Sequence, residues 1–216
     1  MKNPHAWREL GLSPYFRRKK SSEVVASKET IWQQLEEKAG QCTLCRLHET
    51  RTHVVFGMGD KNADWFFIGE GPGEQEDLQG KPFVGPAGKL LDEMLKALGL
   101  CRSTQVYIAN IVKCRPPQNR VPKPDEIQSC LPYLLEQIRL VEPKIIVVLG
   151  KTAASALLER DEALAKLRGD IHAFAGVPLI VTYHPAYLLR NPADKKKSWQ
   201  DLQLAWQVIN GRLKGG

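Results

Sequence analysis

Four of the five cysteines have a spacing that suits metal binding. Cys42 and Cys45 form a Cys-Thr-Leu-Cys pair, while Cys114 and Cys130 follow far along the chain with fifteen residues between them. Such a pair and two remote thiolates can surround a tetrahedral zinc ion or an iron–sulfur cluster. Structural zinc usually takes its second pair of ligands from another close pair, so this spacing favours the iron–sulfur cluster.

Two other interpretations of these cysteines stay open. A thioredoxin-type redox pair would need a βαβ context, which the sequence around Cys42 lacks. Alternatively, Cys114 and Cys130 are small buried residues without a chemical role. The odd number of cysteines disfavours a simple disulfide framework. Cys101 has no partner at a useful spacing, and we expect it to be a packed core thiol.

A second stretch that could bind a ligand covers residues 69–85. An apolar run, residues 65–68, ends there in glycines, a proline and carboxylates, and a helical pattern follows. A strand, a glycine-rich turn and a helix in this order bring backbone N–H groups close to a ligand. The glycine spacing is neither the dinucleotide pattern nor the phosphate-loop pattern. Phosphate would also be repelled by the four acids of this stretch, which are Glu70, Glu74, Glu76 and Asp77.

Four short runs rich in valine, isoleucine and aromatic residues predict strands that are covered on both faces. They are residues 65–68, 106–112, 145–149 and 179–183. Helical patterns occupy residues 28–39, 88–98, 125–141, 151–160 and 198–213. We expect Pro132 to kink or split the third of these helices. Strands that alternate with helices predict an α/β fold with a largely parallel sheet and helices on both faces.

The C-terminal ends of parallel strands are where such sheets bind ligands. The residues that follow the four predicted strands, or end them, are polar or glycine. They are Glu70 with Gly71, Asn110, Gly150 with Lys151, and His184 with Pro185. We therefore expect the functional site at this edge of the sheet.

The composition is that of a soluble globular protein, with 216 residues of which 43% are hydrophobic and 25% charged. No apolar run approaches the length of a membrane span and no apolar signal core follows Met1, so we expect a cytoplasmic protein. The net charge of +7 permits nucleic-acid binding without establishing it. Residues 1–27 are polar and basic, and we expect them to be a mobile or loosely docked extension.

Four motifs follow one another along the chain: Gly69-Glu70-Gly71-Pro72-Gly73-Glu74, Gly80-Lys81-Pro82-Phe83-Val84-Gly85, Asn110-Ile111-Val112-Lys113-Cys114-Arg115-Pro116-Pro117 and His184-Pro185-Ala186-Tyr187-Leu188-Leu189-Arg190. With the four cysteines, they strongly resemble the family 4 (type a) uracil-DNA glycosylases, which are iron–sulfur enzymes of bacteria and archaea. The resemblance covers about residues 35–213. It implies a three-layer α/β/α sandwich around a four-stranded parallel sheet, formed by residues 28–216 as a single domain.

The resemblance also implies an activity and a cofactor. The family hydrolyses the N-glycosidic bond of deoxyuridine in DNA and leaves an abasic site for base-excision repair. The thiols that match its [4Fe-4S] ligands are Cys42, Cys45, Cys114 and Cys130. We expect uracil-containing DNA, single- or double-stranded, as the partner of a monomeric protein.

Roles for individual residues follow from the same resemblance. Phe83 matches the aromatic residue that stacks on the flipped base, and Asn110 matches the residue that recognises its Watson–Crick edge. His184, with backbone N–H groups of Glu70 and Gly71, matches the group that stabilises the departing uracil anion. Glu70 either orients the attacking water or stabilises the cationic sugar by its charge. Other matches are Glu76, which shapes the pocket, Asn119 in support, and the minor-groove residues Tyr187, Leu188, Leu189 and Arg190.

Two other functions compete with hydrolysis of the N-glycosidic bond. A relative of this family bonds covalently to uracil through a histidine in an inserted loop, but residues 115–123 contain no histidine. A non-catalytic, metal-bearing DNA-binding module would need the basic runs and the cysteines, but not Phe83, Asn110 or His184. We interpret Glu74 and Asp77 as solvated acids in either case.

Overall fold

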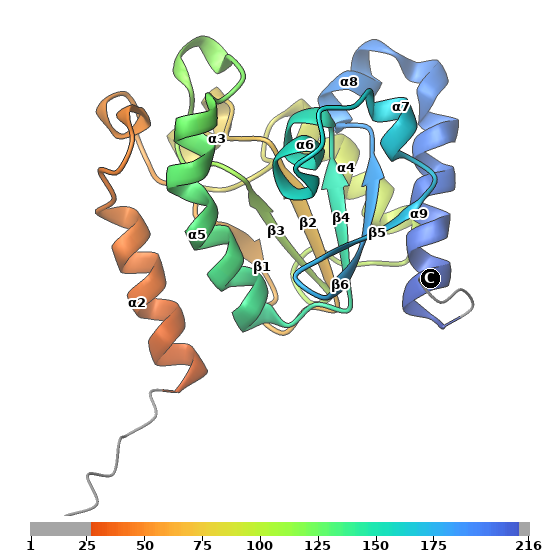
Figure 1. The fold of residues 1–216 in the computed structure, drawn as a ribbon, viewed down its shortest axis with the longest axis horizontal. Helices are drawn as coiled ribbons and strands as arrows, with labels where there is room; N and C mark the ends of the chain where they lie inside the picture. The colour runs from red at the N-terminus through yellow and green to blue at the C-terminus, as the bar shows by residue number, and fades with distance from the viewer. Residues whose placement is uncertain (1–26, 212–216) are drawn as a thin grey trace, which may run out of the picture.

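A six-stranded sheet forms the centre of the protein in the computed structural model, which describes residues 27–211 (Figure 1). The strand order is β1-β3-β2-β4-β6-β5. The strands are β1 (Met58–Gly59), β2 (Trp65–Gly69), β3 (Val106–Asn110), β4 (Ile145–Leu149), β5 (Ile171–Phe174) and β6 (Val177–Thr182). The four predicted strands are β2, β3, β4 and β6, and they pair in parallel as neighbours. The α/β class with a central four-stranded parallel sheet is therefore confirmed.

The two additional strands pair antiparallel at the edges of the sheet, β1 with β3 and β5 with β6. Sequence analysis did not predict them, for a different reason in each case. The strand β1 is only two residues long, and β5 is a partly exposed Ile-His-Ala-Phe run without a strong apolar pattern. Neither edge strand contributes a residue to the site described below.

Alternate strand residues point into two separate cores, one on each face of the sheet. Phe66 and Ile68 pack with α2 (Lys28–Gly40), α5 (Pro124–Val141), α6 (Lys151–Leu158) and α7 (Leu164–Leu167). Trp65 and Phe67 pack with α4 (Pro86–Ala97) and α9 (Lys195–Ile209) on the opposite face. Because apolar residues face both ways, β2 is a continuous apolar run rather than an alternating one. Two short helices, α3 (Glu74–Gln79) and α8 (Pro185–Arg190), follow β2 and β6.

The helix α5 continues through Pro132, so the predicted split of this helix is wrong. Proline removes the hydrogen bond to the carbonyl four residues earlier, which belongs to Gln128. Gln128 and Pro132 are both exposed, so water can satisfy that carbonyl. The buried residues of the same helix, including Leu134 and Ile138, hold the rest of it on the sheet.

Two expectations concern the limits of the described chain. The basic extension, residues 1–27, lies outside the described residues except for Ser27, which caps α2 by accepting a hydrogen bond from the Thr30 backbone N–H at 3.1 Å. Within residues 27–211, none of the helices has the length and apolar character that crossing a membrane requires.

A buried polar network fixes the end of β6, two residues before His184. The Asp201 carboxylate on α9 accepts hydrogen bonds from Arg168 Nε at 2.8 Å and Nη2 at 2.9 Å, and from Thr182 Oγ1 at 2.7 Å. The hydroxyl of Thr182 also lies 2.7 Å from that of Ser198. The Arg168 guanidinium covers the ring of Tyr183 at 4.5 Å. This network therefore holds α9 against the strand that carries His184.

We predict that Asp201→Ala lowers the free energy of unfolding by about 3 kcal/mol, because it leaves the largely buried Arg168 and the buried Thr182 without their shared partner. Asp64→Ala is the matched control, since Asp64 pairs with Lys144 at 2.9 Å on the exposed surface. That change should cost no more than about 1 kcal/mol. Urea denaturation followed by circular dichroism measures both. Equal losses in the two variants would contradict a stabilising role for the buried network.

Candidate active site

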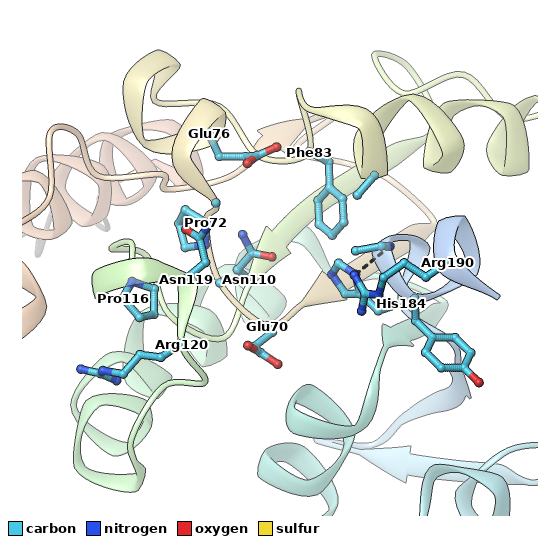
Figure 2. A pocket seen from close by; sticks show the side chains of 15 residues that line it. Glu70, Pro72, Glu76, Phe83, Asn110, Pro116, Asn119, Arg120, His184 and Arg190 are labelled. Carbon is cyan, nitrogen blue, oxygen red and sulfur yellow. Dashed lines mark hydrogen bonds between the residues drawn. The ribbon is translucent and has the colours of Figure 1, made fainter.

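A cavity of about 460 Å³ opens at the C-terminal edge of the parallel strands (Figure 2). Its wall comes from the segments that follow β2, β3 and β6, together with the turn before α4. The sequence-predicted residues that line it are Glu70, Gly71, Glu76, Phe83, Asn110, Asn119, His184, Tyr187 and Arg190. Leu188, Leu189 and Lys151 do not line it. The structure thus has a cavity at the predicted edge of the sheet, although β4 contributes no lining residue.

Asn110 presents an unpaired amide oxygen at the centre of this cavity. It is the last residue of β3, only 1% of it is exposed, and its Oδ1 has no hydrogen-bond partner among the described residues. A buried polar atom of this kind is costly unless a ligand or water satisfies it. Gly69 of the neighbouring strand β2 lies opposite Asn110. A Cβ on residue 69 would lie 2.4 Å from Oδ1 of Asn110. Glycine is therefore required there for Asn110 to face the cavity.

Phe83 forms one wall of the cavity in a strained backbone conformation. Its φ is 54°, in the left-handed region that non-glycine residues rarely adopt. The turn that follows it is fixed by Glu76, whose Oε1 accepts hydrogen bonds from the backbone N–H groups of Val84 and Gly85, both at 2.9 Å. Glu76 therefore acts on the pocket through the backbone next to Phe83.

Arg102 fixes the same turn from its other side. Its guanidinium donates to the carbonyl oxygens of Pro82 at 3.2 Å and Phe83 at 3.0 Å, and it pairs with Asp92 at 2.7 Å. The helix α4 approaches so closely that a Cβ at Gly88 would lie 1.8 Å from the Phe83 oxygen. The position of the Phe83 ring is thus set by groups on both sides of it.

His184 faces Phe83 across the cavity as a neutral donor. Its Nδ1 accepts a hydrogen bond from the Ala186 backbone N–H at 3.1 Å, which leaves the proton of the neutral ring on Nε2. Burial, the largest cause, and the charge of Arg190 together lower the pKa of His184 to about 4, although Glu76 opposes the shift. The rings of His184 and Phe83 lie 5.6 Å apart, with 29° between their planes. The site therefore offers an uncharged imidazole with a fixed tautomer.

The acids of the 69–85 stretch differ in their surroundings. Glu70 lines the cavity and is partly buried, while Glu74 is exposed and lies 3.5 Å from Arg115. Asp77 is buried, so its interpretation as a solvated acid is wrong. Its carboxylate accepts the backbone N–H of Thr52 at 2.9 Å and that of His53 at 3.3 Å. Glu74 and Asp77 both belong to α3, but Glu74 faces solvent and Asp77 faces inward. The sequence of so short a helix does not show which way each residue points.

The residues of α8 that we expected to contact DNA differ in their exposure to solvent. Leu188 is 1% exposed and packs inside, whereas Leu189 is 45% exposed. The Tyr187 hydroxyl donates to Asp194 at 2.8 Å, and its ring stacks on Tyr183 at 5.0 Å. Leu188 therefore does not stand at the surface as a groove-inserting residue, and Leu189 remains as the apolar candidate beside Arg190.

A second cavity lies beside the first, and all four of the motif cysteines, Cys42, Cys45, Cys114 and Cys130, line it. Two donors point at their sulfur atoms: the Lys113 backbone N–H lies 3.2 Å from Cys130 Sγ, and Arg51 Nη1 lies 3.1 Å from Cys114 Sγ. Burial raises the pKa values of Cys45 and Cys114, and it raises that of Cys130 to about 11.

Cys101 does not belong to this group and does not lie in the core. It is exposed on the segment before β3, so the prediction of a packed core thiol is wrong. Hydrogen bonding to Ser103 lowers its pKa to about 7. The absence of a partner at a useful spacing does not require burial, and the thiol lies exposed next to the turn that precedes β3.

The four thiols line one cavity, as the ligands of a polynuclear cluster would. Within residues 27–211, no three cysteine, histidine or acidic side chains converge closely enough to hold one metal ion. A structural zinc would need every sulfur about 2.3 Å from one point. A cluster places several iron atoms between its thiolates, so the thiolates lie further apart around a cavity. Hydrogen bonds to the sulfur atoms are also a feature of such sites.

Sequence analysis missed three basic residues near these cavities. Arg120 lines the first cavity and is held by the buried Glu126 at 2.6 Å. Arg102 fixes the Phe83 turn, as described above. Lys113 lines the cysteine cavity, and its buried Nζ donates to the carbonyl oxygen of Asn110, a residue of the first cavity. Burial lowers the pKa of Lys113 to about 8. The positions of these three basic residues follow no regular spacing, so only the fold identifies their contacts.

Comparison with known proteins agrees with this geometry. The sequence model of the uracil DNA glycosylase superfamily matches residues 56–203. A type-4 uracil-DNA glycosylase of Thermotoga maritima is 45% identical over 171 residues, covering 78% of this chain and 88% of the relative. Those of Pyrobaculum aerophilum and Saccharolobus solfataricus are 43% and 41% identical, covering 80% and 82% of this chain and 91% and 86% of the relatives. The chain therefore belongs to the uracil-DNA glycosylase superfamily and, within it, to the type-4 family.

Proposed function

We propose that this protein is a uracil-DNA glycosylase that hydrolyses the N-glycosidic bond of deoxyuridine in DNA. The observation that carries the proposal is the unpaired Asn110 amide oxygen, which is buried in a cavity between Phe83 and His184. A cavity of this size holds a flipped nucleotide base and part of its sugar. Sequence relatives that share most of the chain are named for the same activity.

Asn110 would select uracil by its Watson–Crick edge. Its Oδ1 can accept the N3–H of uracil, and its Nδ2 can donate to O4. Cytosine presents an acceptor at N3 and donors at N4, so both contacts would be mismatched and left unpaired in a buried site. The ring of Phe83 provides the stacking surface on which the base lies. Glu76 and Arg102 keep that ring in place through the backbone of its turn.

His184 would stabilise the charge that develops on the base. As the bond between C1′ and N1 breaks, its electron pair stays on uracil and spreads to O2. The neutral imidazole can donate its Nε2 proton to O2 as a hydrogen bond, aided by backbone N–H groups of Glu70 and Gly71. Water forms the new bond to C1′ and loses a proton to solvent. The uracil anion takes up a proton after release.

Glu70 faces a sugar that becomes cationic in the transition state. Its carboxylate lines the cavity and is partly buried, so its charge would stabilise an oxocarbenium-like C1′ or orient the attacking water. The acid that repels phosphate is therefore suited to a positively charged sugar. The DNA backbone would be bound instead by Arg190 and the exposed residues Lys195 and Lys196, with Leu189 replacing the extruded base in the stack.

The four cysteines Cys42, Cys45, Cys114 and Cys130 would hold a [4Fe-4S] cluster. When bound, the cluster supplies covalent cross-links between the segment after α2 and the segment after β3, and we give it no part in bond cleavage. The protein would work as a monomer of the 28–216 domain in the cytoplasm, on single- or double-stranded DNA. A DNA-binding module without catalysis would not need the residues that line the first cavity.

Uracil excision itself is the first prediction. Purified protein incubated with a uracil-containing oligonucleotide should give alkali-labile strand breaks at uracil, and none at cytosine. Asn110→Ala should lower kcat/KM at least about tenfold, because the variant loses the buried hydrogen bonds to the base. An intact oligonucleotide after incubation with the iron-loaded protein would refute the glycosylase proposal. A protein–DNA adduct that survives denaturation would instead indicate covalent capture.

The protonation state of His184 gives a second prediction. Because its pKa is lowered to about 4, His184 is neutral at pH 7 and becomes charged only as the pH falls through that value. The rate should therefore show no histidine-dependent fall between about pH 8 and pH 5, although a free histidine titrates near 6.5. His184→Ala should lower kcat by about 10²–10³, as removal of comparable anion-stabilising donors does. A fall centred near pH 6.5 that His184→Gln abolishes would contradict a neutral donor.

The cysteines give a third prediction, in which Cys101 serves as an internal control. Cys130→Ser should reduce the iron and sulfide content per chain and the visible absorbance of the purified protein, because it removes one of the four ligands. Cys101→Ser should leave both unchanged, since Cys101 lies apart from the cysteine cavity. Zinc in place of iron in the wild-type protein prepared without oxygen would count against the cluster.

A further inference from the structure

Lys113 has a buried ammonium group that forms no ion pair with a carboxylate of the described residues. It is 2% exposed, and its Nζ donates to two neutral groups, the Asn110 carbonyl oxygen at 2.9 Å and Gln137 Oε1 at 2.6 Å. None of the ion pairs between described residues includes Lys113. Burying an ammonium group without a counter-charge is strongly unfavourable. A negatively charged group bound next to Lys113 would offset this cost.

The cysteine cavity is where that charge can come from. Lys113 lines this cavity, its backbone N–H donates to Cys130 Sγ, and Cys114 is the next residue. Cysteines ligate metal as thiolates, and an iron–sulfur cluster with four thiolate ligands carries a net negative charge. A cluster in this cavity would therefore place a negative charge next to Lys113.

The same ammonium group fixes the backbone of the base-recognising residue. The bond from Lys113 Nζ to the Asn110 carbonyl closes the turn between the end of β3 and Cys114. Gln137, the other partner, is itself held by its Nε2, which donates to Phe56 O at 2.9 Å and to the Tyr107 hydroxyl at 3.3 Å. Lys113 is thus held in one position, and with it the peptide that carries the Asn110 side chain.

We propose that Lys113 is a positioning residue that joins the two cavities: its charge balances the cysteine-bound cluster, and its ammonium group orients Asn110 toward the base. The inference rests on the proposed function of the first cavity. Lys113 would then connect the cysteine site to uracil recognition, whereas cross-links between chain segments alone would not.

Lys113→Met tests the proposal, because methionine fills similar space without charge or donor. At equal iron content per chain, kcat on uracil-containing DNA should fall about 10–100-fold through misplacement of Asn110. The KM for DNA, set mainly by backbone contacts, should change less than about threefold. The midpoint potential of the cluster should become more negative, because a nearby positive charge stabilises the reduced state. The matched control is Lys144→Met on the surface, which should alter none of these quantities.

Several results would overturn the proposal. One is a variant that loses thermal stability but keeps the wild-type kcat per iron-loaded molecule, since Lys113 would then be merely structural. An unchanged midpoint potential, or a lowered kcat without a shift in potential, would disprove the link between the two cavities. Inactivity of the wild-type protein on uracil-containing DNA would count against the proposed function instead.

A measurement on the wild-type protein decides the matter if neither Lys113→Met nor Lys113→Gln loads iron. Coupling between two sites is reciprocal, so a ligand in the first cavity must affect the cluster. Saturating free uracil should therefore shift the midpoint potential of the wild-type cluster, while thymine at the same concentration serves as the comparison. No shift with uracil would overturn the proposal.

Discussion

The parallel pairing of β2 with β3 is the interaction on which the candidate active site depends. It places Gly69 directly opposite Asn110 at the end of both strands. A Cβ on residue 69 would lie 2.4 Å from the amide oxygen of Asn110 and 2.7 Å from the ring of Phe83. Only glycine therefore allows a buried amide and an aromatic ring to meet at this point. The hydrogen bond from the Ile111 N–H to the Gly69 oxygen, at 2.9 Å, continues the pairing past the last strand residue.

Two other parts of the site, His184 and the turn at Phe83, are held by hydrogen bonds that join a side chain to the backbone. His184 is oriented by the Ala186 N–H, and the turn at Phe83 by the Glu76 carboxylate and the Arg102 guanidinium. Hydrogen bonds to backbone atoms hold a ligand site more precisely than contacts between flexible side chains. Charge is kept away from the base-binding face, since His184 is neutral and Asn110 is an amide. The negative charge is instead near the place expected for the sugar, at Glu70.

The sequence was sufficient to predict the four parallel strands and most of the residues that line the first cavity, because both leave local signals. Apolar runs covered on both faces identified β2, β3, β4 and β6, and the residues after three of these strands proved to line the cavity. Apart from the split expected at Pro132, the predictions that failed concern the direction of one side chain. Asp77 and Leu188 face inward and Cys101 outward, because helix rotation and turn geometry are set by tertiary packing. The contacts of Arg102 and Lys113 connect distant segments and leave no periodic pattern in the sequence.

The two cavities are connected by more than the turn between Asn110 and Cys114. Arg51 donates to Cys114 Sγ and to the Cys42 carbonyl, so it joins both halves of the cysteine site. The next residues, Thr52 and His53, donate their backbone N–H groups to Asp77 on α3. Asp77 and Glu76 are neighbours on α3. The helix therefore holds the Phe83 turn through Glu76 and is bonded through Asp77 to the residues that follow Arg51. Under the proposed function, loss of the cluster would loosen the Phe83 wall through α3 and the Asn110 wall through Lys113, and the cysteines would then belong to the framework that recognises the base.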